Sequence, residues 1–424
     1  MKLSAFGEKF AANSGISGLM EDLGAALSDD PSLLFMGGGN PGRVDALETA
    51  FTDRLRSLID DREQRHQLLG VYQAPQGERA FRDEFAAYLR RRFGWPVSAE
   101  HIAIANGSQS AFFILHNLFA GPMGDGTERQ IHLPLTPEYV GYRDIGLGNS
   151  FFTATRPQME RIGDREFKYR IDFDALSLSD RVAALCVSRP SNPTGNVITD
   201  DEVAELDRLA RAADIPLIID GAYGQPFPGL VYDAVEPFWN DNTVLMLSLS
   251  KLGLPGVRTG VVVARPDIAR AFSRASTVVN LACGTLGPAL LRGMFSDGSL
   301  DRLCTDHLLP FYRQRAELAL AAVRAGLGSL PVHVHRAEGA FFLWLWCEGL
   351  PIDSMQLYAR LKARGVIVLP GNDFFIGLGG DWQHSRECLR ISYAGEPSTI
   401  KAGIALVMDE LHRAYAEGQD KQGS

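Results

Sequence analysis

Short apolar runs alternate with longer segments of helical periodicity through the middle of the chain. The apolar runs predict buried strands, at 102–105, 131–134, 150–156, 185–188, 216–220, 244–247 and 261–264. Segments with apolar residues at helical spacing lie between and before them, at 45–68, 78–93, 111–119 and 199–211. Because strands that alternate with helices are typical of a mostly parallel sheet wrapped by helices, we predict an α/β fold for this part of the chain.

The two ends of the chain follow a different pattern. Residues 1–30 predict a partly amphipathic helical arm, with apolar side chains at helical spacing: Ile16, Leu19, Met20, Leu23 and Leu27. Beyond Pro310 we predict strands and helices in mixed order, at 310–326, 332–335, 341–346, 353–364, 366–369, 389–393 and 398–415. We therefore expect an N-terminal arm with part of a small domain at 1–44, a large domain at 45–305 and a small α+β domain at 306–424.

Length, charge and cysteine usage narrow the class of protein. A chain of 424 residues is long enough for two or three domains, and its net charge of −9 argues against a nucleic-acid partner. The sequence contains no apolar stretch long enough to span a membrane, and its first residues lack the pattern of a signal peptide. The five cysteines are scattered without a Cys-x-x-Cys pair, which favours reduced thiols and a cytoplasmic location.

The segment from Ser248 to Gly260 carries the most informative chemistry. It places Lys251 among hydroxyl residues and glycines, with Arg258 seven positions later. A lysine amine that loses its proton can form a Schiff base with an aldehyde cofactor. The Ser248 hydroxyl and the Arg258 guanidinium group could hold a phosphate beside that amine. Taken alone, the segment is equally compatible with a surface turn that carries an ordinary lysine.

Other candidate residues follow the predicted strands. The stretch from Asn106 to Ser110, which joins a strand to a helix, can bind an anion at the helix N-terminus, although an N-cap looks similar. Asp220 ends a buried strand, at the edge where open α/β sheets bind ligands, and an N-cap is again the alternative. Tyr139 can stack on a flat cofactor or simply be buried, and Asn192 lies in a loop bracketed by prolines. Arg390, inside an apolar strand, is expected to pair with a carboxylate of the protein or of a substrate.

Two further patterns remain ambiguous. The glycine loop from Met36 to Gly42 is either a turn or a place where backbone N–H groups meet a ligand carboxylate. His333 and His335 share one face of a predicted strand, but no third ligand is near them in the sequence. We therefore predict no metal site.

The candidates together predict one type of site. Ser108, Gln109, Ser248 and Arg258 would form a phosphate cup, beside a carboxylate, an aromatic ring, an asparagine and a lysine. Pyridoxal 5′-phosphate enzymes need these groups, because the carboxylate keeps the pyridine nitrogen protonated and the ring can then accept electrons from the substrate Cα. The sequence therefore predicts a pyridoxal phosphate enzyme.

The order of the motifs carries a family resemblance. The motifs are Asn192-Pro193-Thr194-Gly195, Asp220-x-x-Tyr223, Ser248-x-Ser250-Lys251 and Gly256-x-Arg258-x-Gly260. In this order, and with Arg390 late in the chain, the sequence resembles the class I and II, fold-type I aminotransferases over nearly its whole length. The resemblance implies a large domain with a mostly parallel sheet wrapped by helices, and a smaller α+β domain built from both chain ends.

The resemblance also implies roles for individual residues. Lys251 forms the Schiff base with the cofactor and shuttles the proton between Cα and the cofactor's C4′, while Asp220 pairs with the pyridine nitrogen. The other implied cofactor contacts are Tyr223 and Asn192 at the phenolic oxygen, Tyr139 on the ring, and Gly107, Ser108, Gln109, Ser248 and Arg258 at the phosphate. Arg390, the backbone of Gly39 and Asn192 bind the substrate carboxylate. Tyr72 matches a tyrosine that reaches a phosphate in the neighbouring subunit, which implies a homodimer.

Further motifs narrow the expected substrates. The segments 37–41, 106–113, 188–190 and 341–346 resemble bacterial aminotransferases that exchange an amino group between valine and pyruvate, by a ping-pong reaction. Aminotransferases for acidic side chains need a second arginine, and no motif nominates one. The alternatives are an aminotransferase of broader or different specificity and a fold-type I lyase. A regulator with a DNA-binding module would need room before residue 37, and a catalytically inactive scaffold would lack some of these groups.

Overall fold

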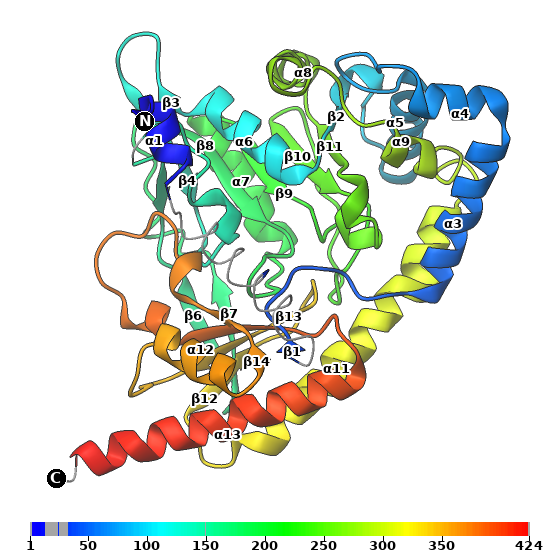
Figure 1. Ribbon diagram of the computed structural model, residues 1–424. Coiled ribbons are helices and arrows are strands. Elements are labelled where there is room, and N and C mark those ends of the chain that lie inside the picture. The colour runs from blue at the N-terminus through cyan, green and yellow to red at the C-terminus, as the bar shows by residue number, and fades with distance from the viewer. Residues whose placement is uncertain (1, 13–23, 25–32, 149, 423–424) are drawn as a thin grey trace.

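The computed structural model describes residues 2–12, 24, 33–148 and 150–422 (Figure 1). Within these residues, eight strands form a large sheet. In spatial order they are β2 (Ile102–Ala105), β11 (Gly260–Val263), β10 (Thr243–Ser248), β9 (Leu217–Asp220), β8 (Val182–Ser188), β4 (Glu128–Leu133) and β3 (Gly121–Pro122), with β5 (Phe152–Ala154) also paired to β4. Strands β10, β9, β8, β4 and β5 pair in parallel, whereas β11 and β3 run antiparallel to their neighbours. The mostly parallel sheet predicted from the apolar runs is confirmed.

Helices cover both faces of the large sheet. On one face Ile218 and Met246 belong to the same apolar cluster as Phe112 of α6 (Ser108–Phe119) and Phe272 of α8 (Pro266–Asn280). On the other face lie α5 (Arg79–Phe93) and α7 (Asp200–Ala212), which begins with the capping box of Thr199 and Glu202. Strands buried on both faces are apolar at consecutive positions, which explains why their sequences do not alternate.

The carboxyl ends of four strands meet at one edge of the large sheet. They end at Ala105 (β2), Ser188 (β8), Asp220 (β9) and Ser248 (β10). Ser188 and Asp220 are register partners across β8 and β9, and Asp220 pairs with Met246 on β10. The loops that follow these ends therefore converge, as expected for ligand sites of open α/β sheets.

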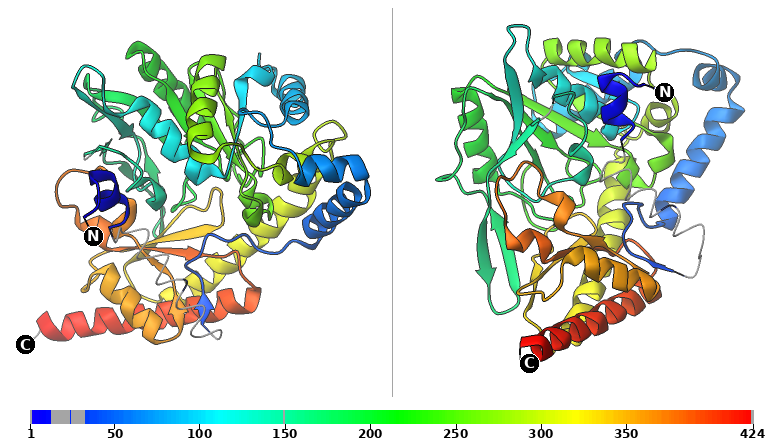
Figure 2. Two further views of the ribbon diagram at one scale, coloured as in Figure 1. Left: turned by 45° about the horizontal axis from the view of Figure 1, so that its top comes forward. Right: turned by 60° about the vertical axis from the view of Figure 1, so that its left-hand side comes forward.

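Six of the described strands form a second sheet. In spatial order they are β15 (Leu369–Pro370), β16 (Cys388–Ser392), β13 (Phe342–Cys347), β12 (Val332–His335), β7 (Glu166–Arg170) and β6 (Gln158–Ile162). Three helices contact this part of the chain: α11 (Leu309–Leu327), α12 (Ser354–Ala363) and α13 (Pro397–Gln422). Both views of Figure 2 show α13 running along the outer side of the second sheet, beyond the predicted end of that helix at residue 415.

The hairpin of β6 and β7 was not predicted. It lies within the stretch 45–305, yet β7 pairs with β12 of the second sheet, and Figure 1 shows it leaving the large sheet for the second one. Its sequence carries charged residues at many positions, because β6 is a largely exposed edge strand, so no apolar run marks it. The predicted division at residue 305 therefore separates the hairpin from the sheet that it completes.

The N-terminal region contacts both parts of the molecule. Helix α1 (Ala5–Phe10) packs beside α6, where the ring centroids of Phe10 and Phe113 lie 5.7 Å apart. Strand β1 (Leu34–Phe35) pairs in parallel with β14 (Val366–Ile367), close to the second sheet. The apolar positions that predicted an amphipathic arm, Ile16, Leu19, Met20, Leu23 and Leu27, lie outside the described residues.

The remaining helices connect the two sheets. They are α3 (Asp45–Asp60), α4 (Arg62–Leu69), α9 (Leu286–Leu291) and α10 (Ser299–Arg302), which continues through a π-helical segment (Leu303–Leu308) into α11. None of the helices in the described ranges is long and apolar enough to cross a membrane.

Candidate active site

Lys251 lies just beyond the end of β10, in a short helical turn (Ser250–Leu252). Its Nζ donates a hydrogen bond to the carbonyl oxygen of Gly39 at 2.7 Å and faces the rings of Tyr223 and Phe341, with centroids at 5.1 and 5.5 Å. Burial lowers the pKa of Lys251 to about 8, and the positive charge of Arg390 lowers it further. The amine can therefore lose its proton close to neutral pH, as a nucleophilic lysine requires.

Asp220, at the end of β9, is held by two donors. Its Oδ2 accepts a hydrogen bond from Tyr142 Oη at 2.6 Å, and its Oδ1 accepts one from the backbone N–H of Ala222 at 2.9 Å. Burial raises the pKa of the Asp220 carboxyl, whereas the bond from Tyr142 lowers it. Tyr142 was not predicted as a site residue, and its only signal in the sequence is its position three residues after Tyr139.

Arg390 reaches from β16 of the second sheet to the loops of the large sheet. Its Nη1 donates to Asn192 Oδ1 and its Nη2 to the carbonyl oxygen of Gly37, each at 2.6 Å. Its guanidinium carbon lies 4.2 Å from the ring centroid of Phe342, and its buried Nε has no hydrogen-bond partner among the described residues. Burial lowers the pKa of Arg390 to about 10. The structure thus brings Arg390 and Asn192 together, as predicted, but through Gly37, while the carbonyl of Gly39 binds Lys251.

The predicted phosphate end lies where α6 begins. Gly107 has a φ of +90°, and a Cβ at this position would lie 2.4 Å from Nη2 of Arg258, so only glycine fits. Ser248 Oγ accepts a hydrogen bond from the backbone N–H of Ser250 at 3.2 Å. The first N–H groups of α6, from Ser108 on, have no partner within the helix and can bind an anion there.

These side chains line one cavity of about 140 Å³. Nine predicted residues line it: Ser108, Gln109, Tyr139, Asn192, Asp220, Tyr223, Ser248, Lys251 and Arg258. Gly39, Gly107 and Arg390 contact members of this group. Tyr72 does not line the cavity, and its side chain is 81% exposed.

The cavity fits pyridoxal 5′-phosphate. Among the described residues, two buried oxygens that belong to lining side chains, Tyr223 Oη and Gln109 Oε1, have no hydrogen-bond partner. A buried polar atom without a partner costs free energy, so its presence in a cavity indicates a polar ligand. The cavity also combines an anion-binding helix start, a carboxylate and a lysine of lowered pKa, which are the groups that this cofactor needs.

Glu138 is a second residue that the sequence analysis did not select. It is fully buried behind the cavity, where it contacts Ser188 and the backbone of Tyr139. Burial raises the pKa of its carboxyl to about 8, while the hydrogen bonds from Ser188 lower it. A glutamate between a proline and an aromatic residue has no distinctive sequence pattern, so only the fold identifies it.

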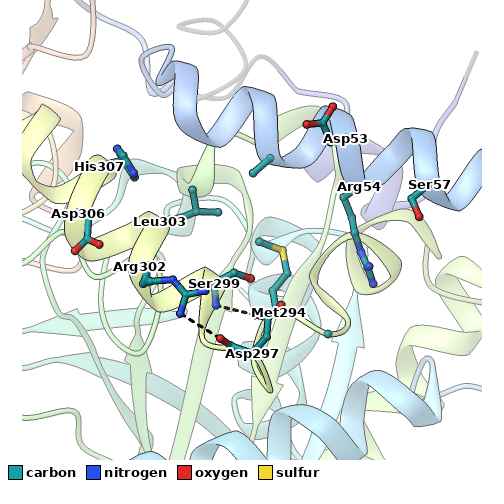
Figure 3. A pocket seen from close by; sticks show the side chains of 12 residues that line it. Asp53, Arg54, Ser57, Met294, Asp297, Ser299, Arg302, Leu303, Asp306 and His307 are labelled. Carbon is teal, nitrogen blue, oxygen red and sulfur yellow. Dashed lines mark hydrogen bonds between the residues drawn. The ribbon is translucent and has the colours of Figure 1, made fainter.

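A larger groove of about 560 Å³ lies elsewhere, between α3 and residues 293–307 (Figure 3). Its charged side chains come from both elements, and Asp297 within it accepts a hydrogen bond from Ser299 N at 2.7 Å. None of the predicted site residues lines this groove. Its volume alone is therefore no argument for catalysis.

The two strand histidines have partners of their own. His333 Nε2 lies 3.0 Å from Glu348 Oε2, and His335 Nδ1 lies 2.8 Å from the carbonyl oxygen of Arg336. In the part of the chain that the structure describes, no group of His, Cys, Asp or Glu is arranged to hold a metal ion.

Comparison with known proteins agrees with this site. The family model for class I and II aminotransferases matches residues 44–407. The chain is 44% identical to the valine–pyruvate aminotransferase of Escherichia coli K12 over 98% of this chain and 100% of that protein. It is also 25% identical to an aspartate/prephenate aminotransferase of Thermus thermophilus, over 81% of this chain and 84% of that protein.

Solved structures show the same relationship. A putative amino-acid aminotransferase from Psychrobacter arcticum has a TM-score of 0.95 and 41% identity, and covers 98% of this chain and 99% of its own. The valine–pyruvate aminotransferase of Salmonella typhimurium has a TM-score of 0.86 and 41% identity, over 94% of this chain and 100% of its own. The chain therefore belongs to the class I and II aminotransferases, the fold-type I enzymes that depend on pyridoxal 5′-phosphate.

Proposed function

We propose that this aminotransferase converts L-valine and pyruvate into 3-methyl-2-oxobutanoate and L-alanine. The observation that carries the proposal is the 44% identity to the E. coli valine–pyruvate aminotransferase over nearly the full length of both chains. The site is consistent with it, because Arg390 offers one guanidinium group for the α-carboxylate that all these substrates share.

The cavity residues are proposed to hold the cofactor as the family resemblance implies. The start of α6 and Arg258 face the phosphate, Asp220 keeps a proton on the pyridine nitrogen, and Tyr139 covers the ring. The unpartnered Tyr223 Oη donates to the phenolic oxygen, with Asn192 beside it. When bound, pyridoxal phosphate supplies the aldehyde that takes up the amino group and a ring that accepts electrons from the substrate Cα.

Two residues act on the substrate in this proposal. Arg390 binds the α-carboxylate and fixes the orientation of the Cα–H bond. Lys251 removes the Cα proton with its neutral amine and returns it on the other side of the reaction, as a general base whose pKa of about 8 suits neutral pH. The carbonyl of Gly39 orients that amine.

We also propose that the enzyme acts as a homodimer in which Tyr72 reaches the partner's phosphate. Support comes from apolar side chains that this chain leaves exposed near Tyr72 and α8: Leu69, Val71, Val278, Val279 and Leu281. Apolar patches of this kind often mark protein interfaces. A cytoplasmic location remains a prediction.

Single half-reactions test the substrate assignment. The purified holoenzyme is mixed with L-valine, L-alanine, L-aspartate or L-glutamate alone, and the absorption band of the bound cofactor is followed. Loss of the band with valine and alanine, and its return with pyruvate, is expected. Loss only with aspartate or glutamate would retain an aminotransferase but refute the valine–pyruvate assignment. Loss without recovery on adding any 2-oxo acid would favour the lyase alternative.

A further inference from the structure

A buried carboxyl group lies directly behind the cavity, and none of the proposed roles uses it. Glu138 is 1% exposed. Its Oε1 accepts a hydrogen bond from the backbone N–H of Ser188 at 2.8 Å. Its Oε2 lies 2.6 Å from Ser188 Oγ and accepts a bond from the backbone N–H of Tyr139 at 3.2 Å. Among the described residues no ion pair or hydrogen bond joins this carboxyl to a cationic side chain.

Both residues that Glu138 contacts line the cavity. Tyr139 is the side chain expected on the face of the cofactor ring, and Ser188 ends β8 beside Asp220 of β9. One carboxyl group therefore joins the wall that carries the aromatic ring to the strand end next to the expected partner of the pyridine nitrogen. A site that must hold a flat ring in one orientation needs such support from behind.

The hydrogen-bonding pattern requires a carboxyl group. When ionised, Glu138 accepts from both backbone N–H groups and from the Ser188 hydroxyl. When protonated, it donates to Ser188 Oγ and still accepts from both N–H groups. An amide has a single oxygen, so it would turn its NH₂ group toward one of the two N–H groups and leave that donor without an acceptor.

We propose that Glu138 is a positioning residue for the cofactor, which acts by holding the backbone of Tyr139 and Ser188 so that the two walls of the cavity keep the spacing of a flat ring. This inference rests on the proposed placement of pyridoxal phosphate in the cavity. It goes beyond that placement because Glu138 does not itself line the cavity.

The test compares two buried glutamates. Glu387 is 6% exposed and also accepts from one side chain and one backbone group, Trp346 Nε1 at 2.9 Å and Gly349 N at 3.1 Å, but it lies in the second sheet. Apoenzymes of the unaltered protein, Glu138→Ala, Glu138→Gln and Glu387→Gln are titrated with pyridoxal phosphate. The dissociation constant, the absorption maximum of the bound cofactor and the unfolding midpoint are measured.

We expect Glu138→Ala to raise the dissociation constant by about tenfold or more and to shift the absorption maximum. Glu138→Gln should raise it less, because the amide keeps one of the two backbone acceptors. Glu387→Gln should lower the unfolding midpoint and leave both cofactor measurements unchanged. If Glu138→Ala and Glu138→Gln lower only the unfolding midpoint, as Glu387→Gln does, Glu138 is merely structural and the proposal is overturned.

A double-mutant cycle identifies the route of the effect. Ser188→Ala removes the hydroxyl contact, and in the Glu138→Ala background it should add little, because both changes break the same link. Fully additive effects would overturn the proposal. Failure of the unaltered protein to bind pyridoxal phosphate would refute the proposed placement itself, so the two failures are distinguishable.

Discussion

Two lysines show how differently the two sheets use the same residue. Lys168, on β7 of the second sheet, is fully buried and forms an ion pair with Glu338, while it also donates to the carbonyl oxygen of Val197 at 2.9 Å. Lys251, at the edge of the large sheet, has only a backbone carbonyl as its hydrogen-bond partner within the described chain. A buried lysine with a carboxylate partner keeps its charge, whereas one without such a partner has its pKa lowered and becomes reactive.

The same contrast holds for other buried polar groups. In the second sheet, Trp344 Nε1 donates to Tyr169 Oη at 3.0 Å, so a polar pair closes on itself inside the core. At the edge of the large sheet, the buried Tyr223 Oη faces a cavity without a partner among the described residues. The difference between satisfied and unsatisfied buried groups thus separates the part of the molecule that maintains the fold from the part that binds a ligand.

Replacing Lys251 should have the largest effect on activity. We expect Lys251→Ala to lower the rate of both half-reactions by about a thousandfold or more, because the base and covalent partner are removed together. The unfolding midpoint should stay the same or rise, since the lost amine had no carboxylate partner. Stopped-flow absorbance and thermal unfolding of the same samples measure the two effects. Retained transfer by this variant would exclude Lys251 from the mechanism.

Replacing Lys168 should show the opposite pattern. Lys168→Met leaves the Glu338 carboxylate buried without its cation, and this should cost about 3–5 kcal/mol of unfolding free energy. Its control is Arg324→Met, which breaks the exposed pair with Glu166 and should cost less than about 1 kcal/mol. Urea unfolding measures both. Equal costs for the two variants would mean that burial of the ion pair is unimportant.

Tyr142 should affect the cofactor without contacting it. Tyr142→Phe removes the hydrogen bond to Asp220 Oδ2, which should raise the pKa of that carboxyl and weaken its pairing with the pyridine nitrogen. We expect cofactor affinity to fall by about ten- to a hundredfold. Equilibrium titration of the apoenzyme measures it, with Tyr169→Phe in the second sheet as the control that should leave affinity unchanged. The same affinity in Tyr142→Phe and the unaltered protein would show that Asp220 does not need this donor.

The smallest expected effect is on pH dependence. Because the pKa of Lys251 is lowered to about 8, its amine is protonated below that pH and neutral above it. Covalent capture of pyridoxal phosphate by the apoenzyme should therefore accelerate by about tenfold per pH unit up to pH 8 and then level off. Rapid-mixing absorbance measures the rate, with N-acetyl-lysine as the control, whose capture should keep rising toward pH 10. A rate that also keeps rising to pH 10 in the apoenzyme would show an ordinary lysine.

Much of the large sheet and its site was predictable from the sequence. Buried parallel strands are continuous apolar runs, and their carboxyl ends meet at one edge, so residues such as Asp220 and Lys251 could be assigned to a common site before the fold was known. The predicted strand at 366–369 is divided in the structure into β14 and β15, which belong to different sheets. Backbone pairing partners, which apolar runs do not encode, decide such divisions.

The tertiary structure alone decided which groups meet from distant parts of the chain. The β6–β7 hairpin is too polar to be recognised as part of a sheet, and it acquires its partner only when β12 lies beside β7. Tyr142 and Glu138 became functional candidates because the turn that carries them packs against Asp220 and Ser188, about fifty to eighty residues away. Residue type and local period follow from the sequence, but the donor that reaches a given carboxylate depends on how the strands and loops pack.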